Sequence, residues 1–394
     1  MNAPKLRFKE FNDEWQNYKV KEILKISNGI NKEKEFFGSG TPIINYMDVN
    51  KNELISHNIV KGLVIANSKE LETFNVKKGD ILFTRTSETS DEIGLSSSVI
   101  ENIDKCIFSG FILKGTQSKQ FIHPYFGGYY FRNPKMRKEI IKHSSITTRA
   151  LTSGSLLSQM SISIPTIIEQ KKIGKTLSLL DKKVELQAKK IEDLKLFKLY
   201  LQNKLYNAND TKDVLIKDLG EIVTGTTPSK SENKYWDNGN ILWITPTDIC
   251  ENRDINDCSC KLTESGLAKG RFIPKNSILV TCIASIGKNA IIKEDGSCNQ
   301  QINAIIPSKD YNYNYIYYMI ENLSNYMKSI AGTSATAIIN KEQFGNINIK
   351  IHKREVQDKI SKILNAFETK IIQEGFKYKK LQNLKKGLMQ NMFV

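Results

Sequence analysis

The chain has 394 residues, of which 40% are hydrophobic and 9% aromatic, a composition typical of folded proteins and a length sufficient for two hydrophobic cores. It contains no run of about 18 apolar residues, so we expect no membrane span, and the charged stretch before Trp15 lacks the apolar core of a signal peptide, so we expect a cytoplasmic protein. The net charge of +16 at pH 7 favours nucleic acid as a partner, although solubility or an acidic protein partner would also account for it.

The first 165 residues are predicted to form a globular module of mixed helix and strand. Three predicted strands are bounded by Gly, Asn or Ser and lie near 79–84, 95–100 and 107–113. A helix rich in Tyr and Phe is predicted around 124–142, and the alternating segment Ile162 to Ile164 closes the module. This order of elements indicates an α+β fold.

A long helix is predicted over 166–208. Pro165 and Thr166 mark its start, Glu169 in the first turn suits the helix dipole, and Asn207–Asp210 favours its end. At about 1.5 Å per residue, a helix of roughly 38 residues is about 57 Å long. A single amphipathic helix of that length needs a partner to cover its apolar stripe.

The second half of the chain repeats the first, with a module over 209–352 and a helix over 353–394. Val20–Ile23 resembles Ile216–Leu219, and Asp80–Thr84 resembles Ser277–Thr281. Further counterparts are strands near 276–282, 290–292 and 302–306, a helix near 312–329 and a closing strand at 347–351. We therefore predict two similar globular domains that differ mainly in loop length.

The two helices match without a gap at a separation of 187 positions. Their apolar residues recur at alternating steps of 4 and 3, the spacing of a coiled-coil seam. The seam residues are Ile173, Leu177, Leu180, Val184, Ile191, Leu194, Leu201 and Leu205 in the first helix and Ile360, Leu364, Phe367, Ile371, Tyr378, Leu381, Leu388 and Met392 in the second. Polar residues interrupt both seams at matching places, Gln187 and Lys198 in the first and Glu374 and Lys385 in the second.

We predict that the helices form an antiparallel coiled coil with a pseudo-twofold repeat. The second module must fit between the two helices, and a parallel arrangement would place the modules side by side. An antiparallel arrangement would place them at opposite ends of the pair. Polar residues inside the seam would then set its register and orientation at some cost in stability.

Most of the excess positive charge lies on the helices. Residues 167–205 hold 10 Lys and 5 acidic residues, and residues 353–394 hold 10 Lys or Arg and 4 acidic residues. A solvated helix face accounts for this pattern, and so does a surface that lies along a duplex or an acidic partner.

Polar loops recur at matching places in the two modules and carry the candidate DNA contacts. Arg, Lys, Thr and Asn on loops can reach phosphates and base edges, although these residues also form ordinary turns. The candidates are Lys32, Lys34, Thr84, Arg85, Thr86, Ser87, Thr147, Thr148, Arg149, Thr226, Lys230, Lys234, Lys288, Asn289, Ser334 and Thr336.

The sequence lacks the motifs of DNA-modifying enzymes. There is no Asn/Asp-Pro-Pro-Tyr/Phe loop of an adenine methyltransferase, no Gly-rich cofactor loop and no phosphate-binding GxxxxGK[ST]. The four histidines do not cluster, and Cys258-Ser-Cys260 is not a zinc-binding pair. We predict no catalytic residues, no metal and no cofactor.

Together these features resemble the specificity subunit of a Type I restriction–modification system. The opening Pro4–Phe8 with Phe11 and Trp15 is similar to the family's common start, Trp243–Asp248 to its strand motif, and Gln300-Gln301 near Ala304 to a further family patch. The order of recognition domain, long helix, recognition domain and long helix covers the whole chain.

The resemblance implies a non-catalytic reader of double-stranded DNA. Each target-recognition domain would read one half of a split site, and the helix pair would fix the gap between the halves. The helices would also dock two methyltransferase subunits, which bring S-adenosylmethionine, and restriction motor–nuclease subunits would complete the complex. The alternatives are a helical adaptor or scaffold for acidic protein partners, and a stand-alone nuclease or methyltransferase with an unfamiliar site.

Overall fold

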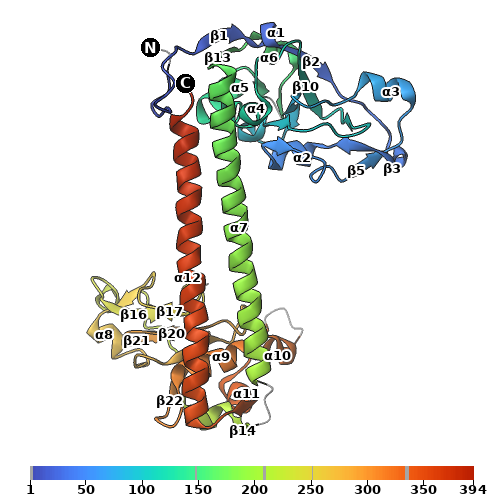
Figure 1. The fold of residues 1–394 in the computed structure, drawn as a ribbon. Helices are drawn as coiled ribbons and strands as arrows, with labels where there is room; N and C mark the ends of the chain where they lie inside the picture. Colours follow the sequence, from blue (N-terminus) through green and yellow to red (C-terminus); the bar gives the residue numbers. More distant parts are fainter. Residues whose placement is uncertain (1–2, 147–148, 207–209, 251, 333–336) are drawn as a thin grey trace. The chain divides into compact units, whose positions relative to one another are not determined.

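The computed structural model describes residues 3–146, 149–206, 210–250, 252–332 and 337–394. The chain divides into two compact units, whose elements are labelled in Figure 1. Unit 1 comprises Met1–Ala188 and Phe376–Val394, and unit 2 comprises Lys189–Gly375. Each unit therefore contains one globular module and a part of each long helix.

The module of unit 1 is built around a five-stranded sheet in the order β2–β10–β6–β8–β4. These strands are β2 (Leu24–Asn28), β10 (Ile112–Gln117), β6 (Ile81–Thr84), β8 (Ser96–Val99) and β4 (Leu54–Ile55). Smaller sheets pair β5 (Gly62–Val64), β3 (Phe37–Ile44) and β9 (Ile107–Phe108); β11 (Ser145–Ile146), β12 (Ala150–Leu151) and β7 (Thr86–Ser87); and β1 (Gln16–Lys19) with β13 (Ser161–Ile164). Every residue of the central strands β6 and β8 is buried, as expected for strands that are covered on both faces.

Short helices surround these sheets. They are α1 (Val20–Ile23), α2 (Tyr46–Lys51), α3 (Ser68–Thr73), α4 (Pro124–Tyr130), α5 (Pro134–Lys142) and α6 (Gly154–Gln159). The aromatic side chains of α4 enter the core of the unit, where Phe126 packs at 6.1 Å from Trp15 and stacks at 5.1 Å from Tyr130. This core also receives the first turns of the long helix through Ile173 and Leu177.

The module of unit 2 repeats the sheets of unit 1 except β11–β12–β7, which has no counterpart among the described residues. Its five-stranded sheet has the order β15–β22–β19–β20–β17, beside a β18–β16–β21 sheet and a β14–β23 pair. The strands are β14 (Lys212–Leu215), β15 (Gly220–Thr224), β16 (Ile241–Ile244), β17 (Asp254–Ile255), β18 (Lys261–Leu262), β19 (Ile278–Thr281), β20 (Asn289–Ile292), β21 (Gly296–Cys298), β22 (Ile302–Pro307) and β23 (Asn348–Ile351). The helices are α8 (Glu264–Leu267), α9 (Tyr313–Asn322), α10 (Ser324–Ile330) and α11 (Lys341–Gly345).

Even the register of strand pairing is repeated. Ile112 of β10 pairs with Thr84 of β6, and Ile302 of β22 pairs with Thr281 of β19. The predicted α+β class and internal repeat are confirmed.

The single helices predicted around 124–142 and 312–329 are each two helices, so these predictions were wrong in detail. In unit 1 the break falls before Pro134, which has no backbone N–H and disfavours a helical residue before it. The Asn133 side chain accepts hydrogen bonds from the backbone N–H groups of Lys135 and Met136 and so caps a new helix. In unit 2 the helical structure is interrupted at Leu323, between α9 and α10.

The two long helices are unbroken in Figure 1, α7 over Ile167–Tyr206 and α12 over Arg354–Asn391. Each seam residue is buried or half-buried. None of the described helices combines the length and apolarity needed to cross a bilayer.

The helices run antiparallel within each unit, as predicted. In unit 1 the start of α7 shares a core with Met392 and Phe393, which directly follow α12, and Asp181 pairs with Lys385 at 2.6 Å. In unit 2 the end of α7 meets the start of α12. Phe197 lies 5.5 Å from Phe367, and Leu205 packs against the core that holds Ile360 and Leu364.

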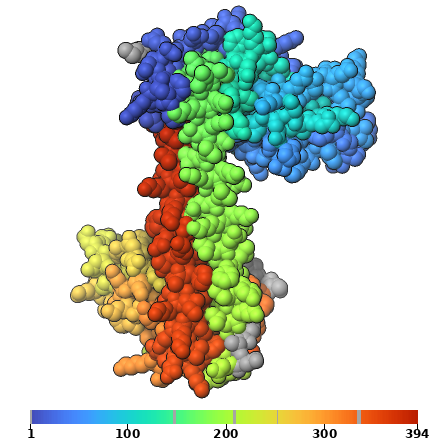
Figure 2. All heavy atoms as spheres, viewed as in Figure 1, coloured from blue at the N-terminus to red at the C-terminus, as the bar shows by residue number. Residues whose placement is uncertain are grey.

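The N-terminal segment lies beside the start of α7 in unit 1, as Figure 2 shows in dark blue next to green. Arg7 makes a two-pronged ion pair of 2.8 Å to the buried Glu169. The backbone N–H of Leu6 donates to the carbonyl of Asn391 at 2.9 Å. This segment therefore ties the beginning of α7 to the end of α12.

Candidate nucleic-acid interface

A threonine at the end of a central strand holds the base of a polar loop in unit 1. The backbone N–H of Gly94 donates to the carbonyl of Thr84 at 3.2 Å, and the Thr84 hydroxyl donates to the carbonyl of Glu92 at 3.2 Å. Gly94 has φ +61°, a conformation that glycine adopts without strain. The result is a closed loop over 85–93 whose base is fixed by the central sheet.

This loop meets two other polar segments at a hollow that we call the polar pocket. The pocket has a volume of about 490 Å³ and is lined by Ile26, Ser27, Asn28, Arg85, Ser153, Gly154, Ser155 and Ser158. Pairing of β12 with β7 brings 150–155 beside Arg85, because Ala150 pairs with Ser87 and Leu151 with Thr86. The backbone N–H of Thr152 also donates to the Arg85 carbonyl at 3.0 Å.

The guanidinium of Arg85 is the one cation among the residues that line this pocket. Within the described ranges, neither the Arg85 guanidinium nor the Asn28 amide has a hydrogen-bond partner. The serines are partly engaged: Ser153 Oγ lies 2.8 Å from Ser155 Oγ, and Ser158 donates to the carbonyl of Gly154 at 2.6 Å. The pocket therefore offers several unused donors to a ligand.

Unit 2 repeats the threonine but shortens its loop. The N–H of Gly287 donates to the carbonyl of Thr281 at 2.9 Å, and the Thr281 hydroxyl contacts the carbonyls of Ser285 and Lys288. Ala284 has φ +60° in this loop, a conformation that is costly for a residue with a Cβ. Position 282, which aligns with Arg85, holds a buried cysteine whose Sγ accepts from Asn303 at 3.2 Å.

Two of the predicted contacts lie inside the modules. Thr84 is fully buried and serves the loop base described above. Asn289 is buried too, and its amide donates to the carbonyl of Tyr317 at 2.8 Å. The prediction that these two side chains face DNA was wrong, because their strands continue into the covered part of the sheet.

The other predicted residues of unit 1 that the structure describes lie at or near the surface, except for Ser87, which is buried. Lys32 pairs with Glu70 at 2.8 Å and lies over the Phe36 ring, whereas Lys34 is exposed. Thr86 is half-buried, and the Ser87 hydroxyl accepts from the N–H of Thr89 at 3.2 Å. Arg149 is exposed. Thr147 and Thr148 lie outside the described residues.

In unit 2, three predicted lysines are exposed: Lys230, Lys234 and Lys288. Lys234 pairs with Glu232 at 3.2 Å. Thr226 has a buried hydroxyl without a partner among the described residues, while its carbonyl accepts from the indole of Trp243 at 3.0 Å. Ser334 and Thr336 lie outside the described residues.

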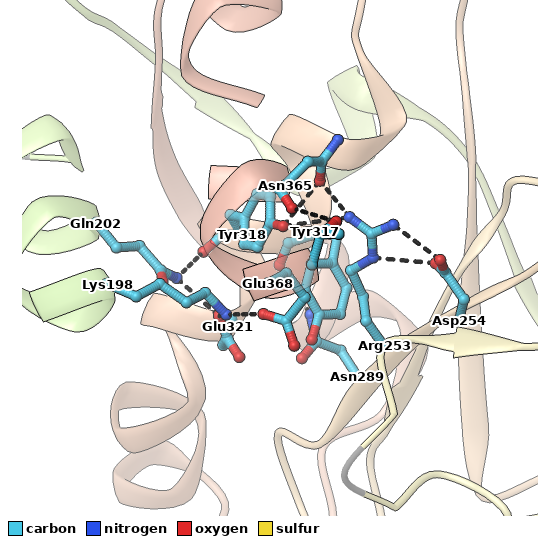
Figure 3. Close-up of polar contacts among 11 residues, drawn as sticks. Lys198, Gln202, Arg253, Asp254, Asn289, Tyr317, Tyr318, Glu321, Asn365 and Glu368 are labelled. Carbon is cyan, nitrogen blue, oxygen red and sulfur yellow. Dashed lines mark hydrogen bonds and ion pairs between the residues drawn. The ribbon is translucent and has the colours of Figure 1, made fainter. Parts of the chain in front are cut away.

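Each seam lysine joins a module to the helix pair. In unit 2, Lys198 pairs with Glu368 of α12 at 2.7 Å and with Glu321 of α9 at 3.5 Å, as Figure 3 shows. Its ammonium lies 5.0 Å from the Tyr318 ring centre. Gln202 donates to Glu321 at 3.0 Å and to the Tyr318 carbonyl at 2.7 Å. The module is thus fastened to α7 and α12 at one point.

Arg253 extends this cluster in unit 2 (Figure 3). It pairs with Asp254 at 2.8 Å and donates to the Tyr318 hydroxyl at 3.2 Å and to Asn365. Burial works against the cation, but the bonds to Asp254 and Tyr318 still raise the pKa of Arg253. The cation at this point is therefore held in place by its partners.

Unit 1 contains the matching cluster around Lys385. Lys385 pairs with Asp181 at 2.6 Å and with Glu53 at 2.9 Å, and the Tyr129 hydroxyl donates to Asp181 at 2.7 Å. Burial alone would lower the pKa of Lys385 and raise that of Glu53. The attraction of Glu53 and Asp181 nevertheless raises the pKa of Lys385, and the attraction of Lys385 and Arg132 lowers the pKa of Glu53.

Some of these residues escaped prediction from the sequence. The seam breaks Lys198 and Lys385 were visible as interruptions, but their partners Glu53 and Glu321 were not. Asn28 and the serines that line the polar pocket were not among the predicted candidates, although a Ser-Gly-Ser run such as Ser153–Ser155 is a common start of a helix. Among the described residues, no group of three or more His, Cys, Asp or Glu side chains is placed to hold a metal.

Comparison with known proteins identifies this arrangement. The model of the Type I restriction modification DNA specificity domain matches residues 12–196 and again residues 209–383. Each match covers one module and most of the helix that follows it.

The chain belongs to this DNA specificity domain family.

Several curated relatives of the family match less than half of this chain. The MjaIX specificity subunit of Methanocaldococcus jannaschii is 32% identical over 185 residues, covering 45% of this chain and 43% of that protein. The EcoR124I/EcoR124II specificity subunit of Escherichia coli is 34% identical over 166 residues, covering 39% and 40%. These matches span less than half the length of either relative. The putative MjaX specificity subunit of Methanocaldococcus jannaschii is 23% identical but covers 98% of this chain and 95% of its own.

Solved structures of the family share the fold. The Type I restriction–modification S subunit from M. genitalium has a TM-score of 0.62 and 15% identity, covering 100% of this chain and 99% of that one. The HsdS subunit from Thermoanaerobacter tengcongensis has a TM-score of 0.50 and 14% identity, covering 95% of each chain.

Within this DNA specificity family member, the two modules share a frame and differ in the loops that the frame presents. Arg85 lines a pocket in one module, and the aligned Cys282 is buried in the other. Loops carried on a rigid scaffold are where binding residues are commonly found.

Proposed function

We propose that this chain is the DNA-recognition subunit of a Type I restriction–modification complex. The observation that carries the proposal is the double match of the specificity-domain model, over 12–196 and 209–383. Two similar modules with different loops suit a DNA site made of two different halves. The net charge of +16 supports binding to a polyanion.

In this proposal each module reads one half of a bipartite site on double-stranded DNA. Exposed loop residues such as Lys34, Arg149, Lys230 and Lys288 are proposed contacts, and Arg85 is a further one. The seam of α7 and α12 fixes the separation of the two halves. The helix pair also docks two methyltransferase subunits, and restriction subunits join that assembly.

We propose that the chain performs no chemistry and holds no cofactor of its own. Adenine methylation and cleavage would belong to the partner subunits. The comparisons offer no support for the alternative of an adaptor for acidic proteins, because the matched family model is described by DNA specificity.

The test is the methylation pattern of DNA from cells that carry this chain with its methyltransferase subunits. We expect methylation at one bipartite sequence, and none in cells that carry the methyltransferase subunits alone. Replacing residues 12–165 by the same segment of another family member should change one half of the site and leave the other. Methylation that does not depend on this chain would refute the proposal.

A further inference from the structure

The polar pocket of unit 1 is a hollow, and its shape limits what it can bind on a duplex. Base edges lie at the floor of the grooves, where a protruding loop or helix can reach them. Phosphates are the outermost groups of the duplex, and a concave surface receives outermost groups. We infer that this pocket seats one backbone phosphate of the first half-site, with Arg85 as its cation; the inference rests on the proposed function.

The chemistry of the lining fits an anion with several acceptor oxygens. A guanidinium presents parallel N–H donors that match two phosphate oxygens at once. The Asn28 amide and the hydroxyls of Ser153 and Ser155 add neutral donors around it. The acidic residues of the same loop, Glu88, Asp91 and Glu92, do not line the pocket.

Hydrogen bonds hold the backbone of Arg85 and leave its guanidinium available to a ligand. Its backbone N–H donates to the carbonyl of Phe111 at 2.9 Å, and its carbonyl accepts from Thr152 at 3.0 Å. The side chain is half-buried and has no partner among the described residues. The backbone position of Arg85 is therefore set before DNA binds, which lowers the entropic cost of the contact.

The aligned position in unit 2 cannot do the same. Cys282 is 3% exposed and its sulfur is hydrogen-bonded to Asn303. Burial raises the pKa of this thiol to about 11, so it stays neutral. Of the two modules, as far as the structure describes them, the one in unit 1 alone therefore has this phosphate-binding pocket. Arg85 positions the module of unit 1 on the DNA backbone without reading the base sequence.

The experiment uses the full chain assembled with its methyltransferase subunits and a duplex that carries the methylated site. The variants are Arg85→Ala and Arg85→Gln. The control is Arg271→Ala, which removes an exposed arginine of unit 2. We expect both Arg85 variants to weaken DNA binding about tenfold or more. The slope of log affinity against log salt concentration should decrease in magnitude by about one, because one phosphate contact is lost. The methylated sequence should not change, and the control should bind like the wild type.

A second measurement starts from the wild-type complex. Phosphates of the first half-site are replaced one at a time by neutral methylphosphonates, and binding of the wild-type complex is measured. We expect one replacement to weaken wild-type binding about tenfold and to have little effect on the Arg85→Gln complex.

Three outcomes would overturn the inference. Relaxed specificity at one base pair in the Arg85 variants would make Arg85 a base reader. Unchanged affinity in those variants would show that Arg85 does not contact DNA. A methylphosphonate scan without a sensitive phosphate in the first half-site would show that the pocket binds no phosphate. A wild-type complex that shows no sequence preference would instead refute the proposed function, which separates the two failures.

Discussion

At the scale of single residues, the two copies share the seam lysine and its partner on the other helix, but the second partner comes from a different element of each module. Lys198 and Lys385 lie 187 positions apart, as do their helix partners Asp181 and Glu368. The second carboxylate comes from Glu321 at the end of α9 in unit 2 and from Glu53 before β4 in unit 1. A cation placed between helices and module needs two negative neighbours, and each copy provides them from a different element.

Replacing Lys198 by Ala tests the contribution of this cation. Its side chain is 11% exposed, and its loss leaves the carboxylates of Glu368 and Glu321 without their cation. Because Gln202 still donates to Glu321 and Glu321 is partly solvated, we expect a loss of about 2 kcal/mol in the free energy of unfolding. Urea denaturation of the variant and the wild type measures it.

The matched control is Lys195→Ala, which removes an exposed lysine from the same helix. We expect its stability to stay within about 0.5 kcal/mol of the wild type. If the two variants were equally stable, the cluster in Figure 3 would have no role in fastening the module.

One part of this cluster could be predicted from the sequence, and the other part could not. A polar residue in an apolar seam is visible in a single helix, so Lys198 and Lys385 could be singled out. Glu53 is 332 positions from Lys385, and such a contact follows from the fold and not from spacing. The burial of Thr84 and Asn289 was missed for the same reason, since a strand residue at a loop boundary can face either way.

At the scale of elements, long periodic segments were predicted well and short ones less well. The helix predicted over 166–208 is observed over Ile167–Tyr206, and that predicted over 353–394 over Arg354–Asn391. Repeated apolar steps over many turns leave little choice of structure. The prediction of one helix around 124–142 was wrong. It followed the apolar composition of the whole segment, whereas Pro134 and the capping side chain of Asn133 start a new helix there.

The end of α12 is predicted to stabilise unit 1 specifically. Phe393 is 1% exposed and lies 5.6 Å from Phe126 and 6.0 Å from Tyr130. The variant Phe393→Ala leaves a cavity in this core, and we expect a loss of about 3–5 kcal/mol in stability. Hydrogen exchange followed by mass spectrometry should show lost protection in the peptides of unit 1.

Phe376→Ala provides the comparison, because Phe376 lies on α12, the helix that Phe393 follows, and is 68% exposed. We expect it to leave the exchange pattern close to that of the wild type. Equal loss of protection in both units after Phe393→Ala would mean that the two units do not unfold separately.

At the scale of the whole molecule, the repeat in the sequence gives two units that each draw on both long helices. Unit 1 is not a continuous stretch of chain, because it combines Met1–Ala188 with Phe376–Val394. Unit 2 is the continuous stretch Lys189–Gly375, which holds the end of α7 and the start of α12. The shared frame could be predicted from the internal repeat. The difference between Arg85 and Cys282 could not, because it depends on which loop residues the frame buries.

The proposed spacing role is tested by shortening both helices together. The ion pairs Asp181–Lys385 and Lys190–Glu374 fall on either side of 182–188 in α7 and 378–384 in α12. Deleting both segments removes one heptad from each helix, which preserves the seam. At about 1.5 Å per residue the helices shorten by about 10 Å, which corresponds to about three base pairs of DNA.

We therefore expect the methylated site of this variant to keep both half-site sequences and to lose about three base pairs from the gap between them. Deleting 182–188 alone is the control, because it shifts one seam against the other and should abolish methylation. A paired deletion that methylates the original site with its original gap would show that α7 and α12 do not set the spacing, since a shortened helix pair cannot hold two rigid modules at an unchanged separation.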